Sequence, residues 1–372
     1  MLKLIFSLSL VGTLLFVGYA MWTERQKTIT FDVSAYRVDD SHLQMADYSL
    51  ISLGKRLFHD PRLSQNQEVS CASCHKLEHS FADSEPVSLG IKKTFVNAPP
   101  LINMQFQKWF FWDGRADNLV SQVLQPLMNP REHGLTPQSL AETFRIHYES
   151  EADFILKKAT KINANRSIRD QQLNLEVAKA LAAYVNSLVA LESPFDRFMA
   201  NYQANDEPNF VEGFGPDEWH GFQVFLGKAR CASCHGGALF TDQDFYVTGL
   251  ASEHRIHRPD AIQTLSQDPL RCFGKDDCTE LPESSHPMSV RTPTLRNLVH
   301  TAPYLHDGSA PTIRDVLYRY MRPRPVEDRH QDITNLYLNA LELNNLEKFL
   351  VSLTSPVREL GEQLEGKTQP SH

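Results

Sequence analysis

The chain has 372 residues, of which 41% are hydrophobic and 22% are charged. This composition is typical of a soluble globular protein, and the length exceeds the usual size of one domain, so two domains are expected. The formal net charge of −8 argues against a nucleic-acid partner. The same charge is compatible with docking a basic protein, and equally with solubility alone.

The first 22 residues are predicted to be a targeting segment. Lys3 supplies a positive start, residues 4–17 carry no charge, and Gly18 and Ala20 provide small residues at a cleavage position. The apolar stretch approaches the roughly 20 residues that are needed to span a bilayer. Segment 1–22 is therefore either a cleaved signal peptide or a membrane anchor, and the rest of the chain is exported in both cases. Contact with a membrane is expected only through such an anchor.

The most informative feature is the sequence Cys-Ala-Ser-Cys-His, which occurs at residues 71–75 and again at residues 231–235. Cys-x-x-Cys-His is the attachment signature of a c-type haem, in which the cysteines bind the vinyl groups and the histidine binds the iron. The residues predicted to hold two covalent haems are Cys71, Cys74, His75, Cys231, Cys234 and His235. A zinc ribbon is the alternative, but its cysteine pairs usually lie roughly 15–20 residues apart. These pairs are 160 residues apart (231 − 71).

Apolar periodicity predicts helices at residues 48–59, 173–191, 216–226 and 341–353, whereas strand signals are weak. The polar stretch 201–216 contains Gly and Pro and marks a domain boundary. The predicted fold is therefore mostly α, with two cytochrome c-like haem domains and long loops. The N-terminal domain is expected at residues 40–205 and the C-terminal domain at residues 206–360.

Further motifs lie around the haem signatures. Residues 110–116 read Phe-Phe-Trp-Asp-Gly-Arg-Ala, and residues 129–132 read Asn-Pro-Arg-Glu. Later, residues 291–297 read Arg-Thr-Pro-Thr-Leu-Arg-Asn and residues 302–308 read Ala-Pro-Tyr-Leu-His-Asp-Gly. Together with the haem signatures, these motifs resemble those of the bacterial dihaem cytochrome c peroxidases and their relative MauG.

This resemblance implies roles for Trp112, Gln122 and Glu132. Reduction of a peroxide requires a group that moves a proton between the two oxygens. Glu132 is the candidate acid–base group, Gln122 the candidate donor that orients the bound oxygen, and Trp112 the candidate electron relay between the haems. Without the resemblance, Glu132 is interpreted as a solvated carboxylate at a helix end and Trp112 as a core aromatic. His133 stands where the family usually has Met, and it either alters the proton supply or only packs.

The distal ligands of the two irons are also indicated by resemblance. Classical members carry a histidine ligand of the first haem where this chain has Ile91, which cannot bind iron, so the first haem is expected to be five-coordinate and open. For the second haem, the family position is Tyr320, where classical peroxidases have Met and MauG has Tyr. The neighbouring Met321 remains the alternative, and Met288 is a distant third.

A calcium ion is implied between the domains, bound by Asn97 and the backbone carbonyls of Thr301 and Pro303, because Ca²⁺ prefers oxygen ligands. A short turn is the alternative explanation of Asn97. His306 is expected to support the distal side of the second haem. The remaining cysteines, Cys272 and Cys278, are expected to form a disulfide, since the chain is exported, and a free reactive pair is the alternative.

Three functions are compatible with these residues. The first is a periplasmic peroxidase that reduces hydrogen peroxide at the N-terminal haem. Its electrons come through the C-terminal haem from a small periplasmic donor, either a cytochrome c or a copper protein. The second is a MauG-like enzyme that uses oxidation at the level of peroxide to modify residues of a protein substrate. The third is a plain electron carrier, which the expected open iron argues against.

Overall fold

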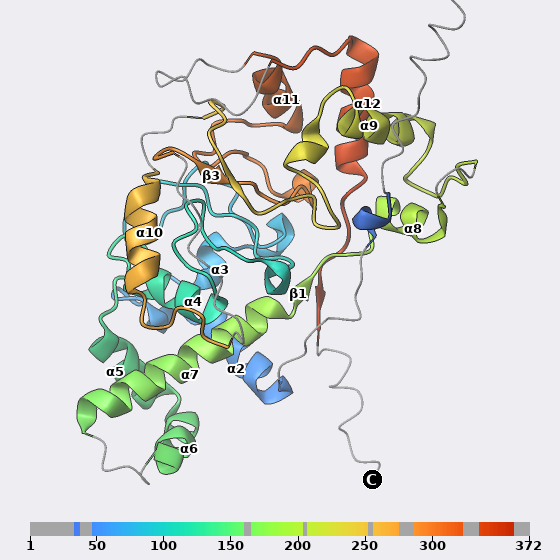
Figure 1. Ribbon diagram of the computed structural model, residues 1–372. Helices are drawn as coiled ribbons and strands as arrows, with labels where there is room; N and C mark the ends of the chain where they lie inside the picture. The colour runs from blue at the N-terminus through green and yellow to red at the C-terminus, as the bar shows by residue number, and fades with distance from the viewer. Residues whose placement is uncertain are drawn as a thin grey trace, which may run out of the picture.

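The computed structural model describes residues 33–37, 47–159, 165–203, 207–251, 256–274, 286–322 and 335–360. The chain is mostly helical, and its described strands are two residues long (Figure 1). The α-helices are α2 (Tyr48–Phe58), α3 (Cys71–Cys74), α4 (Leu119–Met128), α5 (Pro137–His147), α6 (Glu149–Ala159), α7 (Arg166–Asn186), α8 (Pro194–Asn201), α9 (Pro216–Leu226), α10 (Arg258–Gln267), α11 (Ile313–Met321) and α12 (Ala340–Val351).

Short 3-10 helices and strands complete the described structure. The 3-10 helices are η1 (Val33–Tyr36), η3 (Pro61–Leu63), η4 (Leu77–His79), η5 (Met104–Phe106), η6 (Cys231–Ser233) and η8 (Leu298–His300). Strand β1 (Leu188–Val189) pairs antiparallel with β4 (Arg358–Glu359), and β2 (Phe245–Tyr246) pairs antiparallel with β3 (Val290–Arg291).

Local capping sets the start of many of these helices. Asp47 accepts a hydrogen bond from a backbone N–H in the first turn of α2. Thr136, Ser193 and Asn339 form capping boxes at the starts of α5, α8 and α12. Such side chains satisfy the backbone N–H groups that a helix leaves unpaired at its N-terminus.

Two hydrophobic cores organise the helices. The first core gathers side chains of α2, α4, α5 and α7, and the second gathers those of α8, α9 and α12. Each core contains one very close helix crossing at a glycine. A Cβ atom on Gly54 of α2 would lie 1.9 Å from the carbonyl oxygen of Ala180 in α7. A Cβ atom on Gly221 of α9 would lie 2.0 Å from the carbonyl oxygen of Asn345 in α12. The two helix crossings therefore have the same construction.

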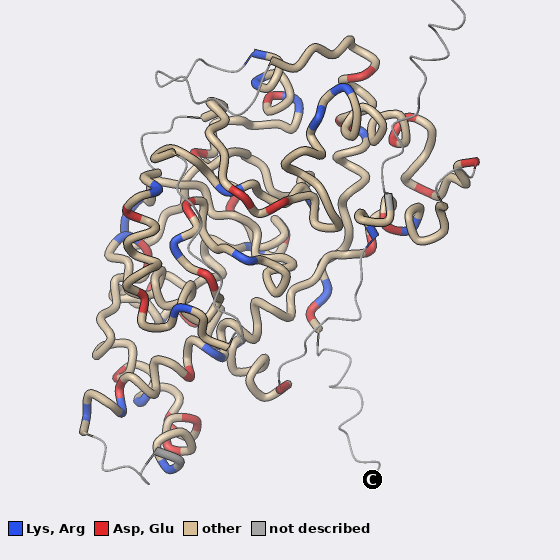
Figure 2. The backbone as a smooth tube through the Cα atoms, viewed as in Figure 1, with Lys and Arg blue, Asp and Glu red and all other residues tan. Residues whose placement is uncertain are grey.

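The two cores are joined by backbone contacts between segments that are distant in sequence. The pairing of β4 with β1 returns the end of the chain to α7 (Figure 1). The Asn97 N–H donates to the carbonyl of His306 at 2.8 Å, and the Arg291 N–H donates to the carbonyl of Trp112 at 2.8 Å. Acidic and basic residues are interspersed along both halves of the tube in Figure 2.

Three of the predicted helices correspond to α2, α9 and α12, and the mostly α fold is confirmed. The prediction of one helix over 173–191 is wrong at both ends, because α7 begins at Arg166 and ends at Asn186. Residues 188–189 leave the helix to pair with β4, although their apolar side chains continue the helical pattern.

Segment 1–22 lies outside the described residues. None of the helices that the structure describes has the length and apolar character to cross a membrane.

The crossing at Gly54 gives a stability prediction. Gly54→Ala should lower the free energy of unfolding by about 1–3 kcal/mol, because the new methyl group overlaps backbone that cannot move aside. At an open helix position the same change would stabilise by about 1 kcal/mol. Urea denaturation measures the difference, with Ser52→Ala on the same helix as a control expected within about 0.5 kcal/mol of wild type. A Gly54→Ala protein as stable as wild type would contradict the crossing.

Candidate dihaem redox site

The first haem motif, residues 71–75, forms α3 and the residue that follows it. The ring nitrogen Nδ1 of His75 lies 2.8 Å from the carbonyl oxygen of Phe81. A carbonyl oxygen can only accept, so Nδ1 carries the proton and Nε2 is left to bind a metal. Burial lowers the pKa of His75, which keeps the imidazole neutral and able to act as a ligand.

The second haem motif, residues 231–235, repeats this arrangement. Nδ1 of His235 lies 2.9 Å from the carbonyl oxygen of Phe240, and burial lowers the pKa of His235 as well. Phe81 and Phe240 are buried and have φ angles of 59° and 54°, a conformation that is uncommon for bulky residues. This conformation is part of the turn that directs each carbonyl to its histidine.

None of the four cysteines of the two motifs is disulfide-bonded, as attachment to haem vinyl groups requires. Burial raises the pKa of Cys71 and of Cys231 to about 12. Two accessible thiol pairs, each followed by an oriented neutral histidine, fit covalent haem c. A mostly helical chain with two such sites has the architecture of a dihaem c-type cytochrome.

Glu132 lies beside the first haem motif. Its negative charge contributes, after burial, to the raised pKa of Cys71 and Cys74. Burial also raises the pKa of Glu132 itself, which the nearby Arg115 and a hydrogen bond from Asn129 partly oppose. Nδ2 of Asn129 donates to Oε1 of Glu132 at 2.6 Å, so the carboxylate is held in a fixed orientation. The Glu132 side chain is half-buried, so it is not the fully solvated carboxylate of the alternative interpretation.

The loop that carries Ile91 is hydrogen-bonded to the segment that carries Glu132. The Ile91 N–H donates to the Glu132 carbonyl at 3.0 Å, and the Lys92 N–H donates to the Arg131 carbonyl at 2.9 Å. The Ile91 side chain packs next to Gly134. The loop is therefore fixed by its backbone, and it presents no group that could bind iron at position 91.

His133 and Gln122 occupy different surroundings. His133 is buried, and its Nδ1 lies 2.6 Å from the Leu63 carbonyl, so its ring is held by the backbone. Burial lowers the pKa of His133, and the ring is neutral. Gln122 is half-buried on α4. No hydrogen bond joins its side chain to Glu132, although the structure describes both residues.

Trp112 lies where the two halves meet. Its indole Nε1 donates to the Asn97 carbonyl at 2.9 Å, and its ring lies 6.2 Å from the His306 ring in an edge-on arrangement. The buried Arg291 holds the same segment, with Nε donating to the Phe111 carbonyl at 3.2 Å. Trp112 therefore contacts both halves at once, which a tryptophan confined to one core would not do.

The second haem motif has Tyr320 as a neighbour. Burial raises the pKa of Tyr320, and the charges of Cys231 and Cys234 raise it further. Met321, at the end of α11, packs against the second hydrophobic core. Cys231 packs against the same core, so Tyr320 and Met321 both lie in the region of the second haem motif.

The expected calcium ligands and the remaining cysteines can also be located. Nδ2 of Asn97 donates hydrogen bonds to the carbonyls of Glu85 and Pro86. The Oδ1 atom of Asn97 is the atom that could act as a ligand for a cation. Among the described residues, no group of three or more His, Cys, Asp or Glu side chains could hold a metal ion.

Cys272 is disulfide-bonded, as expected, and Cys278 lies outside the described residues.

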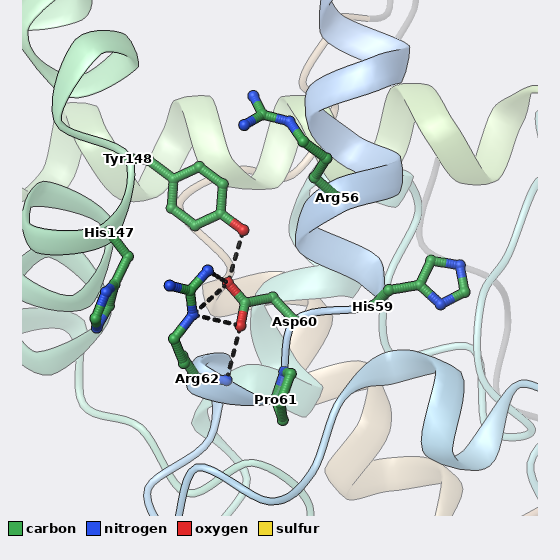
Figure 3. A pocket seen from close by; sticks show the side chains of 7 residues that line it. All are labelled: Arg56, His59, Asp60, Pro61, Arg62, His147 and Tyr148. Carbon is green, nitrogen blue, oxygen red and sulfur yellow. Dashed lines mark hydrogen bonds and ion pairs between the residues drawn. The ribbon is translucent and has the colours of Figure 1, made fainter.

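A surface hollow of about 510 Å³ lies elsewhere, between α2 and α5 (Figure 3). It is lined by Arg56, His59, Asp60, Pro61, Arg62, His147 and Tyr148. Asp60 accepts hydrogen bonds from the Tyr148 hydroxyl at 2.7 Å and from Arg62. No residue of either haem motif lines this hollow, so it is separate from the haem sites.

Two groups of the site were missed by the sequence analysis. Asn129, which orients Glu132, stands three residues before it, a spacing that brings side chains together in a turn. Arg115 approaches Glu132 and is itself paired with Asp113 at 2.8 Å. Both residues lie within the quoted motifs, so the spacing within a turn could have indicated Asn129. The approach of Arg115 depends on the tertiary fold.

Comparisons with known proteins agree with this architecture. A family model described as di-haem cytochrome c peroxidase matches residues 48–204. The cytochrome-c peroxidase IdrP2 of Denitromonas iodatirespirans is 30% identical over 317 residues, which span 82% of this chain and 81% of that protein. The methylamine utilization protein MauG of Methylorubrum extorquens is 30% identical over 275 residues, which span 73% of this chain and 68% of that protein.

A solved structure is also similar. It is a MauG-like protein associated with microbial copper homeostasis, with a TM-score of 0.62 and 26% identity, covering 86% of this chain and 92% of that chain. The chain therefore belongs to the di-haem cytochrome c peroxidase family, together with the MauG proteins. It is an oxidoreductase, and the family implies c-type haem at the two motifs.

Proposed function

We propose that this protein is a periplasmic peroxidase that reduces hydrogen peroxide at the haem held by His75, in an N-terminal domain at residues 40–205. Electrons reach it from a small donor protein through the haem held by His235, in a C-terminal domain at residues 206–360. The reaction consumes one peroxide, two electrons and two protons and yields two waters. The observation that carries this proposal is the half-buried, oriented carboxylate of Glu132 beside the first haem motif.

When bound, haem c supplies an iron that takes up peroxide and receives electrons. Glu132 would take a proton from one oxygen of hydrogen peroxide and deliver it to the oxygen that leaves as water. Burial suits this role, because it raises the pKa of Glu132 and so reduces the free-energy difference between its ionised and protonated forms at neutral pH. Ile91 leaves the distal position open, and Gln122 is the second polar group proposed to orient the peroxide.

Trp112 is proposed to relay electrons between the two haems. Its support is its position between the halves, in contact with Asn97 and His306. We further propose a calcium ion bound by Oδ1 of Asn97 with the backbone carbonyls of Thr301 and Pro303, which would keep the same junction rigid. His306 would support the second haem from the distal side.

Export follows from the chemistry of the cofactor, because haem c is attached outside the bacterial cytoplasm. Segment 1–22 is proposed to direct this export, as a cleaved signal or as an anchor. The electron donor is proposed to be a small periplasmic cytochrome c or copper protein.

A MauG-like oxidation of a protein substrate is the second candidate, and Tyr320 favours it. A phenolate ligand favours ferric iron and lowers the potential of a haem, so a tyrosine at the second haem would suit oxidising states better than a methionine would. Steady-state turnover separates the two functions. Rapid peroxide-dependent oxidation of a reduced cytochrome c supports the peroxidase, whereas peroxide-dependent mass changes in a partner protein support the alternative.

Glu132→Gln should retain both haems but lower the rate of peroxide turnover by about 10²–10⁴-fold, because an amide cannot carry the proton. Haem content from the pyridine haemochrome spectrum and steady-state kinetics provide the measurement. A variant within about twofold of wild type would exclude Glu132 as the acid–base group.

The variant Asn129→Ala tests the role of Glu132 through the pH dependence of peroxide turnover. The Asn129 amide stabilises the carboxylate and lowers the pKa of Glu132. Its removal favours the protonated form, so the pKa of Glu132 rises further and the acid limb of the pH–rate profile moves to higher pH. An unchanged profile would show that Asn129 does not tune the proton-transfer group.

Tyr320→Phe and Met321→Leu test the ligand of the second haem. If the Tyr320 phenolate binds the iron, Tyr320→Phe should change the absorption and magnetic circular dichroism spectra of the second haem, while Met321→Leu leaves both unchanged. The packing of Met321 against the second core gives Met321→Leu a small volume change only. The opposite pattern would assign the ligand to Met321 and place this protein with the classical peroxidases.

A further inference from the structure

The equivalence of the two halves extends to the aromatic rings behind each proximal histidine. At the first crossing, Tyr184 follows Ala180 by one helical turn, and its Cβ would lie 2.8 Å from a Cβ on Gly54. At the second crossing, Phe349 follows Asn345 by one turn, and its Cβ would lie 2.7 Å from a Cβ on Gly221. Tyr184 and Phe349 therefore occupy equivalent positions in the two halves.

Each of these residues packs against two corresponding phenylalanine rings, and Phe349 also contacts the rings of Phe195 and Phe222. The Tyr184 ring lies 5.2 Å from the Phe58 ring and 6.5 Å from the Phe81 ring, whose carbonyl accepts from His75. The corresponding ring, Phe349, lies 5.2 Å from the ring of Phe225 and 5.9 Å from that of Phe240. The carbonyl of Phe240 accepts from His235 in the same way. The equivalent residues Tyr184 and Phe349 differ only by the hydroxyl group of the tyrosine.

That hydroxyl has a carboxylate as its partner. The Tyr184 hydroxyl donates to Oε1 of Glu359 at 3.2 Å, and Nζ of Lys55 lies 2.6 Å from Oε2 of the same carboxylate. The tyrosine is fully buried, whereas the Glu359 side chain is 15% exposed. Glu359 reaches this place because β4 pairs with β1, directly after α7. A buried phenol thus has a proton acceptor that is open to solvent.

We propose that Tyr184 is a redox-active tyrosine that supplies an electron to the first haem site after that site has been oxidised by peroxide. The proposal rests on the proposed function, since peroxide is the oxidant. In this step the phenolic O–H bond breaks. The electron goes to the oxidised haem site and the proton goes to Glu359, which leaves a neutral tyrosyl radical and a neutral carboxylic acid. An electron from the donor protein and the proton on Glu359 restore the phenol.

This step provides a route for electron transfer to the first haem site that does not pass through Trp112. When no electron donor is bound, an unused oxidising equivalent can leave the haem pocket for Tyr184, next to a solvent-exposed ion pair. Phe349 shows that the equivalent packing is complete without a hydroxyl, so packing alone does not require a tyrosine at this position. The alternative role of the hydroxyl is to fasten β4 to α7, and the experiment separates the two roles.

The test is electron paramagnetic resonance of the haem-loaded full chain, frozen rapidly after hydrogen peroxide is added without an electron donor. Wild type should give a radical signal that narrows when the protein contains ring-deuterated tyrosine, and Tyr184→Phe should lose it. Tyr148→Phe is the matched control and should keep the signal. Tyr148 also donates to a carboxylate, that of Asp60, but its ring stacks on Phe144 rather than on the Phe81 group.

A second pair of variants tests the proton. Glu359→Gln should lower the radical yield, because an amide cannot accept the proton, while Lys55→Met breaks the same ion pair and should keep the yield. If Tyr184→Phe or Glu359→Gln keeps the full signal while peroxide is consumed normally, the redox role is overturned and the proposed function stands. If wild type does not react with peroxide, the proposed function and this proposal are both overturned.

Discussion

The hydrogen bond from each proximal histidine to a backbone carbonyl is the constraint on which the rest of the structure depends. It fixes which ring nitrogen can reach an iron, and it requires Phe81 and Phe240 to adopt an uncommon backbone conformation. Both phenylalanines are buried. Their rings are enclosed by helices that cross at a glycine, so helix packing and ligand orientation are parts of one construction.

The two halves share this construction and differ in what surrounds it. Beside the first haem motif lie the half-buried carboxylate of Glu132 and a loop that has an isoleucine at position 91. Beside the second lies Tyr320, whose pKa is raised by burial and by the charges of Cys231 and Cys234. Trp112 joins the two environments, since its indole and backbone contact residues of both halves.

The sequence predicts those features that depend on short spacings. The haem ligands, the helices α2, α9 and α12, and the Trp112 and Glu132 motifs are all local patterns. The end of α7 could not be predicted, because Leu188 and Val189 continue its apolar periodicity and only their pairing with β4 removes them from the helix. The contact of Tyr184 with Glu359 joins residues 175 positions apart, and it depends on that same strand register. No local pattern carries such information.

The central claim is that the haem held by His75 has an open distal position in the resting protein. Electron paramagnetic resonance of the ferric protein, as isolated and without prior reduction, tests this most directly. One high-spin haem, at the first motif, is expected alongside the signal of the second haem. Two low-spin, six-coordinate haems would contradict it, because they would require a ligand on the first iron that Ile91 cannot provide.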